Sequence, residues 1–183
     1  MNESGTPPKN IVLIGFMGSG KSTVGRELHS RLGYELVDMD TVIEQRQGRP
    51  ITRIFEENGE EYFRDLETGL LRELNDANPA RRILSTGGGV VGREENRELL
   101  RKMGYVVWLQ APVEVIAERT GRNRERPLLH TEDPLAKIEA LLEKRKPWYA
   151  ETAHLMVDTA GLDGGELAAG ILESARYFFT GNG

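Results

Sequence analysis

The chain has 183 residues, of which 38% are hydrophobic and 29% charged, a composition typical of one folded globular domain. It contains no cysteine and three histidines, which excludes disulfides and thiolate zinc sites and argues against a histidine-rich metal centre. The net charge of −5 argues against nucleic acid as a partner. No run of about 18 apolar residues occurs, so no membrane partner is expected. Since residues 1–9 lack the apolar core of a secretory signal, we expect a cytoplasmic protein.

Short β-branched apolar runs alternate with helical segments along most of the chain. Strands are expected over Ile11–Ile14, Glu35–Asp38, Arg82–Ser85, Tyr105–Leu109 and Leu155–Val157. Helices are expected over Lys21–Leu32, Thr41–Gln47, Ile51–Phe55, Gly59–Leu74, Arg93–Lys102, Pro112–Arg119, Leu135–Arg145 and Gly165–Phe178. The helix that begins at Leu135 is expected to stop before Pro147. This alternation predicts an α/β fold in which helices cover both faces of a parallel sheet.

The chain shows no internal division into separate domains. We expect a single domain over residues 10–181, preceded by a flexible polar tail over residues 1–9. Two segments, at about 40–74 and 119–133, interrupt the strand–helix alternation. Both are expected to lie as inserts over one end of the sheet.

The segment Gly15–Thr23, GFMGSGKST, fits the phosphate-binding pattern G-x-x-x-x-G-K-[ST] between a predicted strand and a predicted helix. Its glycines allow backbone N–H groups to converge on phosphate oxygens, Lys21 reaches the β- and γ-phosphates, and the Ser22 hydroxyl is a ligand for Mg²⁺. The pattern therefore predicts a nucleoside-triphosphate site. The predicted ATP-binding residues of this loop are Gly18, Ser19, Gly20, Lys21, Ser22 and Thr23.

Two carboxylates follow the second predicted strand, at the edge where ligands of open α/β sheets bind. Asp38 and Asp40 are two positions apart, so along an extended chain both would face the same side. One could lie near Mg²⁺ or the attacking hydroxyl, and the other could accept hydrogen bonds from a polyol. The alternative for Asp40 is that it caps the following helix.

Several further residues suggest that an anionic ligand binds nearby. Arg64 and Glu67 form either a surface ion pair or a pair in which the glutamate orients a guanidinium toward an anionic substrate. Three consecutive glycines, Gly87–Gly89, favour a close backbone approach to a ligand. The arginine-rich stretch Arg119–Pro127 suits a phosphoryl-transfer lid. Arg145 is ambiguous, because a solvated helix end explains it equally well.

Three function classes fit a phosphate-binding loop. Asp158–Gly161 has the D-x-x-G form of a nucleotide-dependent switch, and it follows an apolar run as a Walker B aspartate does. It lies far from the loop, however, and no N-K-x-D sequence accompanies it, so a strand that ends in a turn is favoured. A motor ATPase needs coupling elements, and a chain of 183 residues leaves little room for them. The carboxylates and arginines favour ATP-dependent phosphorylation of a small hydroxyl compound that carries a carboxylate.

The motifs together resemble those of the shikimate kinase family, in order from Asn10 to about Thr159. The matching motifs are Gly15–Gly25, Asp38–Asp40, Phe63 and Arg64 with Glu67, Gly87–Gly89, Arg126–Leu129 and Arg145–Tyr149. The resemblance implies a three-layer P-loop kinase fold with a five-stranded parallel sheet, a substrate-binding segment at about 40–74 and a mobile lid at about 119–133. It implies transfer of the γ-phosphoryl of MgATP to the 3-hydroxyl of shikimate, giving 3-phosphoshikimate and ADP in aromatic amino-acid biosynthesis. We also expect a monomer.

The resemblance implies roles for residues at the acceptor end. Asp40 accepts hydrogen bonds from the shikimate hydroxyls and acts as the base, while Arg64 and Arg145 pair with the shikimate carboxylate. The backbone of Gly87, Gly88 and Gly89 binds a ring hydroxyl. Phe55 and Phe63 line the ring, although core packing explains them equally well.

At the nucleotide end, the resemblance implies that Lys21 contacts the phosphates and that Ser22 holds Mg²⁺. Asp38 lies on the metal side through water, Arg126 is the lid cation near the phosphates, and Arg119 packs against adenine. Met39 is expected to face outward. A gluconate-type kinase is the alternative among enzymes, and a P-loop nucleotide-dependent switch is the alternative from another class.

Overall fold

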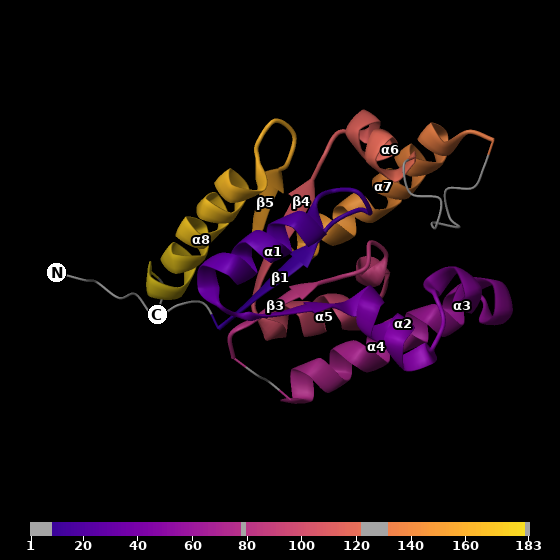
Figure 1. Ribbon diagram of the computed structural model, residues 1–183, viewed down its shortest axis with the longest axis horizontal. Helices are drawn as coiled ribbons and strands as arrows, with labels where there is room; N and C mark the ends of the chain where they lie inside the picture. Colours follow the sequence, from indigo (N-terminus) through magenta and orange to yellow (C-terminus); the bar gives the residue numbers. More distant parts are fainter. Residues whose placement is uncertain (1–8, 78–79, 122–131, 182–183) are drawn as a thin grey trace.

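A computed structural model describes residues 9–77, 80–121 and 132–181. Within these residues it contains a five-stranded parallel sheet with the strand order β2-β3-β1-β4-β5 (Figure 1). The strands are β1 Asn10–Ile14, β2 Glu35–Asp38, β3 Arg82–Ser85, β4 Tyr105–Gln110 and β5 Leu155–Asp158. The expected strands therefore agree with the structure to within one residue at each end. Most of the expected tail and lid lie outside the described residues.

The helices connect the strands and cover the sheet. They are α1 Lys21–Leu32, α2 Met39–Gln47, α3 Ile51–Asn58, α4 Glu60–Ala77, α5 Glu94–Met103, α6 Val113–Gly121, α7 Pro134–Thr152 and α8 Gly164–Gly181, with a 3₁₀ turn, η1, over Val90–Gly92. None of these helices is long and apolar enough to cross a membrane.

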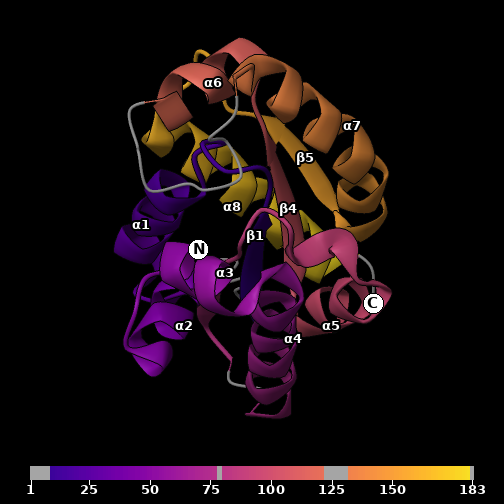
Figure 2. The same cartoon turned by 90° about the vertical axis from the view of Figure 1, so that its right-hand side faces the viewer.

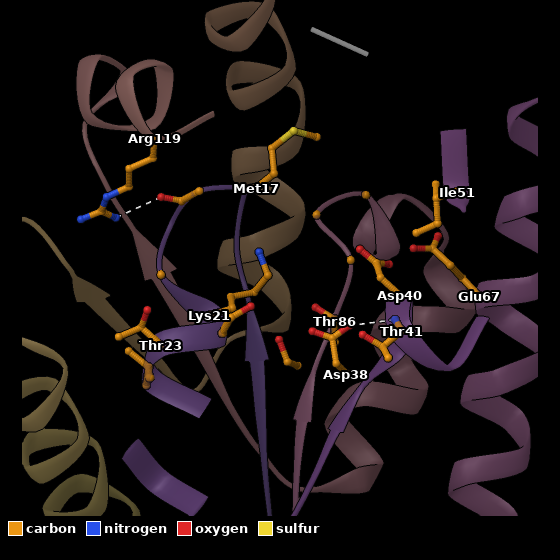
Figure 3. A pocket seen from close by; sticks show the side chains of 18 of the residues that line it. Met17, Lys21, Thr23, Asp38, Asp40, Thr41, Ile51, Glu67, Thr86 and Arg119 are labelled. Carbon is orange, nitrogen blue, oxygen red and sulfur yellow. Dashed lines mark hydrogen bonds between the residues drawn. The ribbon is translucent and has the colours of Figure 1, made fainter. Parts of the chain in front are cut away.

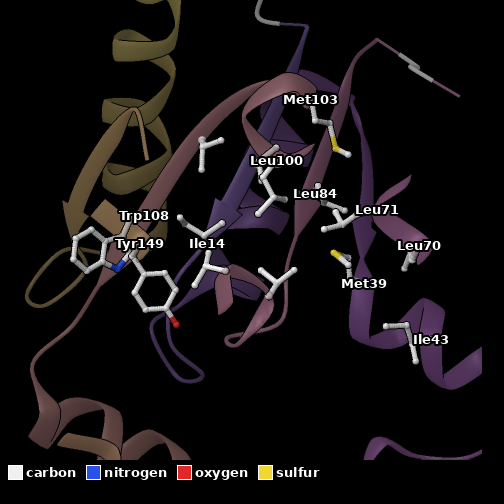
Figure 4. Packing of buried hydrophobic residues seen from close by; sticks show 14 of the residues in the cluster. Ile14, Met39, Ile43, Leu70, Leu71, Leu84, Leu100, Met103, Trp108 and Tyr149 are labelled. Carbon is white, nitrogen blue, oxygen red and sulfur yellow. The ribbon is translucent and has the colours of Figure 1, made fainter. Parts of the chain in front are cut away.

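Alternate residues of the central strand bury opposite faces of the sheet. Ile11 and Leu13 pack in a cluster with side chains of α1 and α8. Val12 and Ile14 pack in the other cluster, with side chains of α2, α4, α5 and α7 (Figure 4). Successive side chains of a strand point to opposite faces, so two-sided burial requires the continuous apolar run that this strand has. The result is the expected three-layer fold, with the sheet as its middle layer.

The carboxyl ends of all five strands meet at one edge, because the pairings in this sheet are parallel. The phosphate-binding loop follows β1, α2 begins directly after β2, and the Gly87–Gly89 segment follows β3. In Figure 2, α2 and α3 lie on one side of this edge and α6 on the other. This edge therefore collects the segments that the sequence marks as functional.

Helix α7 differs from the prediction, because it continues through Pro147 to Thr152. A proline inside a helix removes a backbone hydrogen bond and costs about 3 kcal/mol. Beyond it, Tyr149 and Thr152 are completely buried, and the Tyr149 ring stacks on Trp108 of β4 with a centroid distance of 5.5 Å. Burial of an aromatic side chain contributes roughly 1.5–3 kcal/mol, so this packing offsets at least about half of the cost of the proline. Arg145 and Tyr149 consequently lie one turn apart on the same helix.

Candidate functional site

A cleft of about 620 Å³ opens at the carboxyl edge of the sheet (Figure 3). Figure 3 shows Lys21 and Arg119 near one end of the cleft and Asp40 and Glu67 near the other. The predicted site residues that line it are Gly18, Gly20, Lys21, Ser22, Thr23, Asp38, Asp40, Arg64, Gly87, Gly88, Gly89, Arg119 and Arg145. The Ser19 side chain is instead completely buried, and Arg126 lies outside the described residues.

The phosphate-binding loop has the backbone conformation that its glycines permit. Gly18 and Gly20 have φ values of 77° and 102°, in the left-handed region that favours glycine. Gly20 is the N-cap of α1, so the unpaired N–H groups and the positive end of the α1 dipole face the loop. The Lys21 ammonium donates hydrogen bonds to the carbonyls of Gly15 and Phe16, at 2.6 and 2.9 Å. These features make the loop a phosphate-binding site.

The opposite end of the cleft holds a buried cluster of charged residues. Arg64 donates a 2.7 Å hydrogen bond from Nη1 to Oε2 of Glu67, and the Glu67 side chain has no exposed surface. The interpretation of this pair as a surface ion pair is therefore wrong. Arg145 is 5% exposed, so its interpretation as a solvated helix end is also wrong, and its guanidinium lies 5.3 Å from the Phe16 ring centroid. The Arg64 side chain is 12% exposed, and two cations so largely removed from water in the wall of one cleft suit an anionic ligand.

Burial changes the pKa of the one carboxyl in this pair, that of Glu67. It raises the pKa of the Glu67 carboxyl from 4.5 to about 6, because desolvation disfavours the charged form. The negative charge of Asp40 adds to the rise, while the charges of Arg64 and Arg145 oppose it. The negative charge of Glu67 therefore lowers the stability of the folded protein.

The three consecutive glycines make room for the charged side chains around them. A Cβ atom on Gly87 would lie 2.7 Å from Oε1 of Glu67, and one on Gly89 would lie 2.4 Å from Nη2 of Arg64. None of the three has a φ in the left-handed region, so the need for glycine is steric rather than conformational. The backbone of this segment is thus closely surrounded by side chains that line the cleft, and its close approach to a ligand stays a prediction.

Tyr149 fixes the middle of the glycine segment, a contact that the sequence did not predict. Its hydroxyl donates a 2.5 Å hydrogen bond to the Gly88 carbonyl. Burial raises the pKa of Tyr149 to about 12, so the hydroxyl keeps the proton that it donates. The sequence signal for this contact is the spacing of four residues between Arg145 and Tyr149, which places both on one face of a helix. The prediction missed it because it ended the helix before Pro147.

The two aspartates reach the cleft by a different geometry from the one expected. Asp38 is the N-cap of α2, and its Oδ1 accepts a 3.0 Å hydrogen bond from the Thr41 backbone N–H. Asp40 lies in the first helical turn rather than in an extended chain, and it is not the cap. Met39 is completely buried in the core rather than facing outward, because it begins the helix with its side chain against the sheet.

The D-x-x-G segment forms a turn after the edge strand β5. Oδ1 of Asp158 accepts a 2.8 Å hydrogen bond from the Ala160 backbone N–H. The next residue, Thr159, lines the cleft, and its hydroxyl donates a 2.8 Å hydrogen bond to the carbonyl of Ser19. The geometry matches the favoured interpretation of a strand that ends in a turn. The sequence missed the contact to Ser19, because the two residues are 140 positions apart.

Ser22 and Asp38 line the same cleft, and both carry side-chain oxygen atoms, the hard ligands that Mg²⁺ prefers. Within the described residues, no group of three or more histidine, cysteine, aspartate or glutamate side chains could hold a metal ion. Mg²⁺ in phosphoryl-transfer sites is usually held by one or two protein groups together with substrate phosphates. The donor set therefore fits a magnesium ion that arrives with a nucleotide.

The phosphate-binding loop follows the central strand of a parallel sheet, and the same cleft has a second end lined by charged residues. This arrangement defines a P-loop kinase. Comparison with known proteins then gives the family. The family model described as shikimate kinase matches residues 17–176, so the chain belongs to the shikimate kinase family and is an ATP-dependent kinase.

The relatives match over nearly their whole length. The shikimate kinase of Thioalkalivibrio sulfidiphilus is 45% identical, with 97% of this chain and 90% of that protein covered. That of Thermodesulfovibrio yellowstonii is 44% identical, covering 94% and 98%. Among solved structures, a shikimate kinase from Acinetobacter baumannii in complex with shikimate has a TM-score of 0.87 at 44% identity, with 93% of each chain covered.

A gluconokinase from Sinorhizobium meliloti has a TM-score of 0.56 at 19% identity, covering 94% of each chain. This likeness shows a shared fold alone. The findings therefore support the shikimate kinase interpretation over the gluconate-type alternative.

Proposed function

We propose that this cleft transfers the γ-phosphoryl group of MgATP to the 3-hydroxyl of shikimate, giving 3-phosphoshikimate and ADP, and that the residues around it have the roles described below. The observation that carries the assignment of roles is the arrangement of the cleft. Its phosphate-binding loop, Arg64 and Arg145 line one cavity, with Asp40 also in its wall. A cavity of this kind can hold a triphosphate and a hydroxylated acid together.

The acceptor binds at the charged end. Arg64 and Arg145 pair with the shikimate carboxylate, because each presents a guanidinium that can form charge-assisted hydrogen bonds. Glu67 holds the Arg64 guanidinium in place. Backbone groups of the glycine segment bind a ring hydroxyl, and the rings of Phe55 and Phe63, 5.0 Å apart, line the acceptor ring.

Asp40 is the base. It lines the same cleft as the loop and the two arginines, where it can accept the proton of the attacking hydroxyl. Its position in the first turn of α2 holds it on a rigid element rather than on a loop.

The nucleotide binds at the loop. Backbone N–H groups of the loop and the start of α1 bind the phosphates, and Lys21 exchanges its loop carbonyl contacts for the phosphate oxygens. Ser22, with Asp38 on the same side, would hold Mg²⁺, which would supply positive charge near the β- and γ-phosphates. Arg119, which donates a 3.0 Å hydrogen bond to the Gly18 carbonyl, packs against adenine. The role of Arg126 stays a prediction from the sequence, as do the monomeric state and the cytoplasmic location.

An acceptor screen tests this function. ADP release is measured by a coupled assay with shikimate, with gluconate or with no acceptor, each with ATP and with GTP. We expect rapid ADP release with shikimate and ATP that stops when EDTA removes the metal. Faster turnover with gluconate would support the alternative kinase, and acceptor-independent hydrolysis that prefers GTP would support a switch.

A further inference from the structure

One side chain after the last strand contacts the phosphate-binding loop from outside the motif. Thr159 is 3% exposed, and its backbone N–H donates a 2.8 Å hydrogen bond to the Gln110 carbonyl, which ties it to β4. Its hydroxyl donates to the Ser19 carbonyl at 2.8 Å and lies 3.2 Å from the Gln110 carbonyl. The sheet thus holds the threonine firmly, and the threonine in turn holds the loop.

The bond fixes the orientation of one loop peptide. In a trans peptide the C=O of one residue and the N–H of the next point in opposite directions. With the Ser19 carbonyl turned to Thr159, the Gly20 N–H points the other way. Gly20 lines the cleft and is the N-cap of α1, so we infer that this N–H is turned toward the space in which phosphate would bind. A hydroxyl bonded to the opposite side of this peptide can therefore orient an amide toward the phosphate site.

The loop itself supplies little resistance to a rotation of this peptide. Gly20 has a φ of 102°, and glycine occupies left- and right-handed conformations at similar cost. The Ser19 hydroxyl is buried, and among the described residues it has no hydrogen-bond partner. Neither feature fixes the Ser19–Gly20 peptide, so the hydrogen bond from Thr159 to the Ser19 carbonyl is the contact that can hold its direction.

We propose that Thr159 is a positioning residue for nucleotide binding, which acts by holding the Ser19–Gly20 peptide with its N–H toward the phosphates. This inference rests on the proposed function only in placing a nucleotide at the loop. It also gives the Asp158–Gly161 segment a role other than that of a switch. The Asp158 carboxylate closes the turn that follows β5, and that turn keeps Thr159 against the loop.

The test compares Thr159→Val, which keeps the branched shape but loses the hydroxyl, with Thr159→Ser, which keeps the hydroxyl. Calorimetry measures the Kd of each protein for ADP and for adenosine, which lacks phosphates. A single hydrogen bond of this kind corresponds to about three- to tenfold in affinity. We expect Thr159→Val to weaken ADP by this factor and to leave adenosine unchanged, and Thr159→Ser to restore most of the ADP affinity.

The readouts separate a positioning role from a structural one. Thr180→Val, on the exposed end of α8, is a matched control that should leave both affinities unchanged. If Thr159→Val folds poorly, Thr159→Ala replaces it, and the ADP-induced rise in Tm replaces calorimetry. Equal weakening of ADP and adenosine by Thr159→Val would overturn the proposal, as would a lowered Tm with unchanged ADP affinity. Because ADP binding needs no acceptor, these outcomes are independent of the acceptor screen.

Discussion

Arg64 and Glu67 lie one turn apart on α4 and form an ion pair in which the acidic partner is completely buried. Removal of a carboxylate from water disfavours its charged form. The pKa of Glu67 rises to about 6, so the attraction of the neighbouring arginines does not fully compensate for this desolvation. The fold therefore maintains this pair at the expense of stability. The ion pair holds the Arg64 guanidinium in the wall of the cleft.

We expect Arg64→Ala to raise the KM for shikimate about 10- to 100-fold, because a charge-assisted contact contributes roughly 1.5–3 kcal/mol. The KM for ATP should change little, since the phosphate-binding loop is untouched. Steady-state kinetics with each substrate varied in turn checks this. Arg46→Ala is the matched control, because Arg46 pairs with Glu73 on the exposed surface of the same segment. An unchanged shikimate KM in Arg64→Ala would remove this arginine from the acceptor site.

Glu67→Gln should separate stability from function. Because the folded-state pKa is raised from 4.5 to about 6, the folded protein holds this proton more tightly than the unfolded chain does. Its stabilising effect is thus complete below pH 4.5 and is lost as the pH rises through about 6. Glutamine stays neutral, so the variant should gain about 1–2 kcal/mol in unfolding free energy relative to the parent between pH 4 and pH 8.

Urea denaturation at the two pH values measures this gain, and the same preparations give the shikimate KM at pH 8. That KM should rise, because the neutral amide orients Arg64 less well. Glu73→Gln, with its carboxylate exposed, controls for the loss of a paired glutamate. A stability difference between parent and Glu67→Gln that does not depend on pH would contradict the buried charge as its cause.

Gly89→Ala should impair acceptor binding through Arg64. The new methyl group would lie 2.4 Å from Nη2 of Arg64, so the guanidinium must move. We expect the shikimate KM to rise about tenfold or more, as for partial loss of the charged contact. Gly69→Ala is the control, because no atom lies within 4 Å of its Cβ position in the middle of α4. That variant should keep its kinetics and gain roughly 0.5–1 kcal/mol of stability. Equal kinetics in both variants would exclude the steric argument.

Tyr149→Phe removes only the hydroxyl that holds the Gly88 carbonyl. We expect the Kd for shikimate to rise about three- to tenfold, the value of one neutral hydrogen bond, with the ring packing on Trp108 preserved. Isothermal titration with shikimate and thermal unfolding of the same protein distinguish local from global effects. A fall in Tm without any change in shikimate affinity would assign the hydroxyl to folding alone.

Lys21→Ala should reduce kcat by at least about 10³-fold, since removal of a cation that stabilises the transition state typically costs several kcal/mol. Single-turnover measurements with saturating ATP and shikimate separate this loss from weaker nucleotide binding. Lys137→Ala, at an exposed position of α7, serves as the control. Activity within twofold of the parent in Lys21→Ala would refute the role of this lysine.

The sheet and the phosphate-binding loop were predictable because local patterns specify them. Both Glu35–Asp38 and Arg82–Ser85 are strands with the expected bounds, since each is a short apolar run between polar residues. The loop motif likewise needs residues at fixed positions within nine residues of chain. Such features depend on neighbours in sequence rather than on the assembled fold.

The errors concern relationships that appear only when segments pack together. Exposure of the Arg64–Glu67 pair could not be judged without knowing that α4 lies beside the glycine segment. The stop at Pro147 followed helix propensity, which the burial of Tyr149 overrides. The contact from Thr159 to Ser19 joins opposite ends of the chain, and no local pattern announces it.

The packing of α7 has a spectroscopic consequence. The chain has two tryptophans, Trp148 within α7 and Trp108, whose ring stacks on Tyr149 of the same helix. Both indoles thus report on the helix that carries Arg145. The protein consequently has its own optical probe, since ultraviolet emission will respond to any displacement of that helix without an added dye.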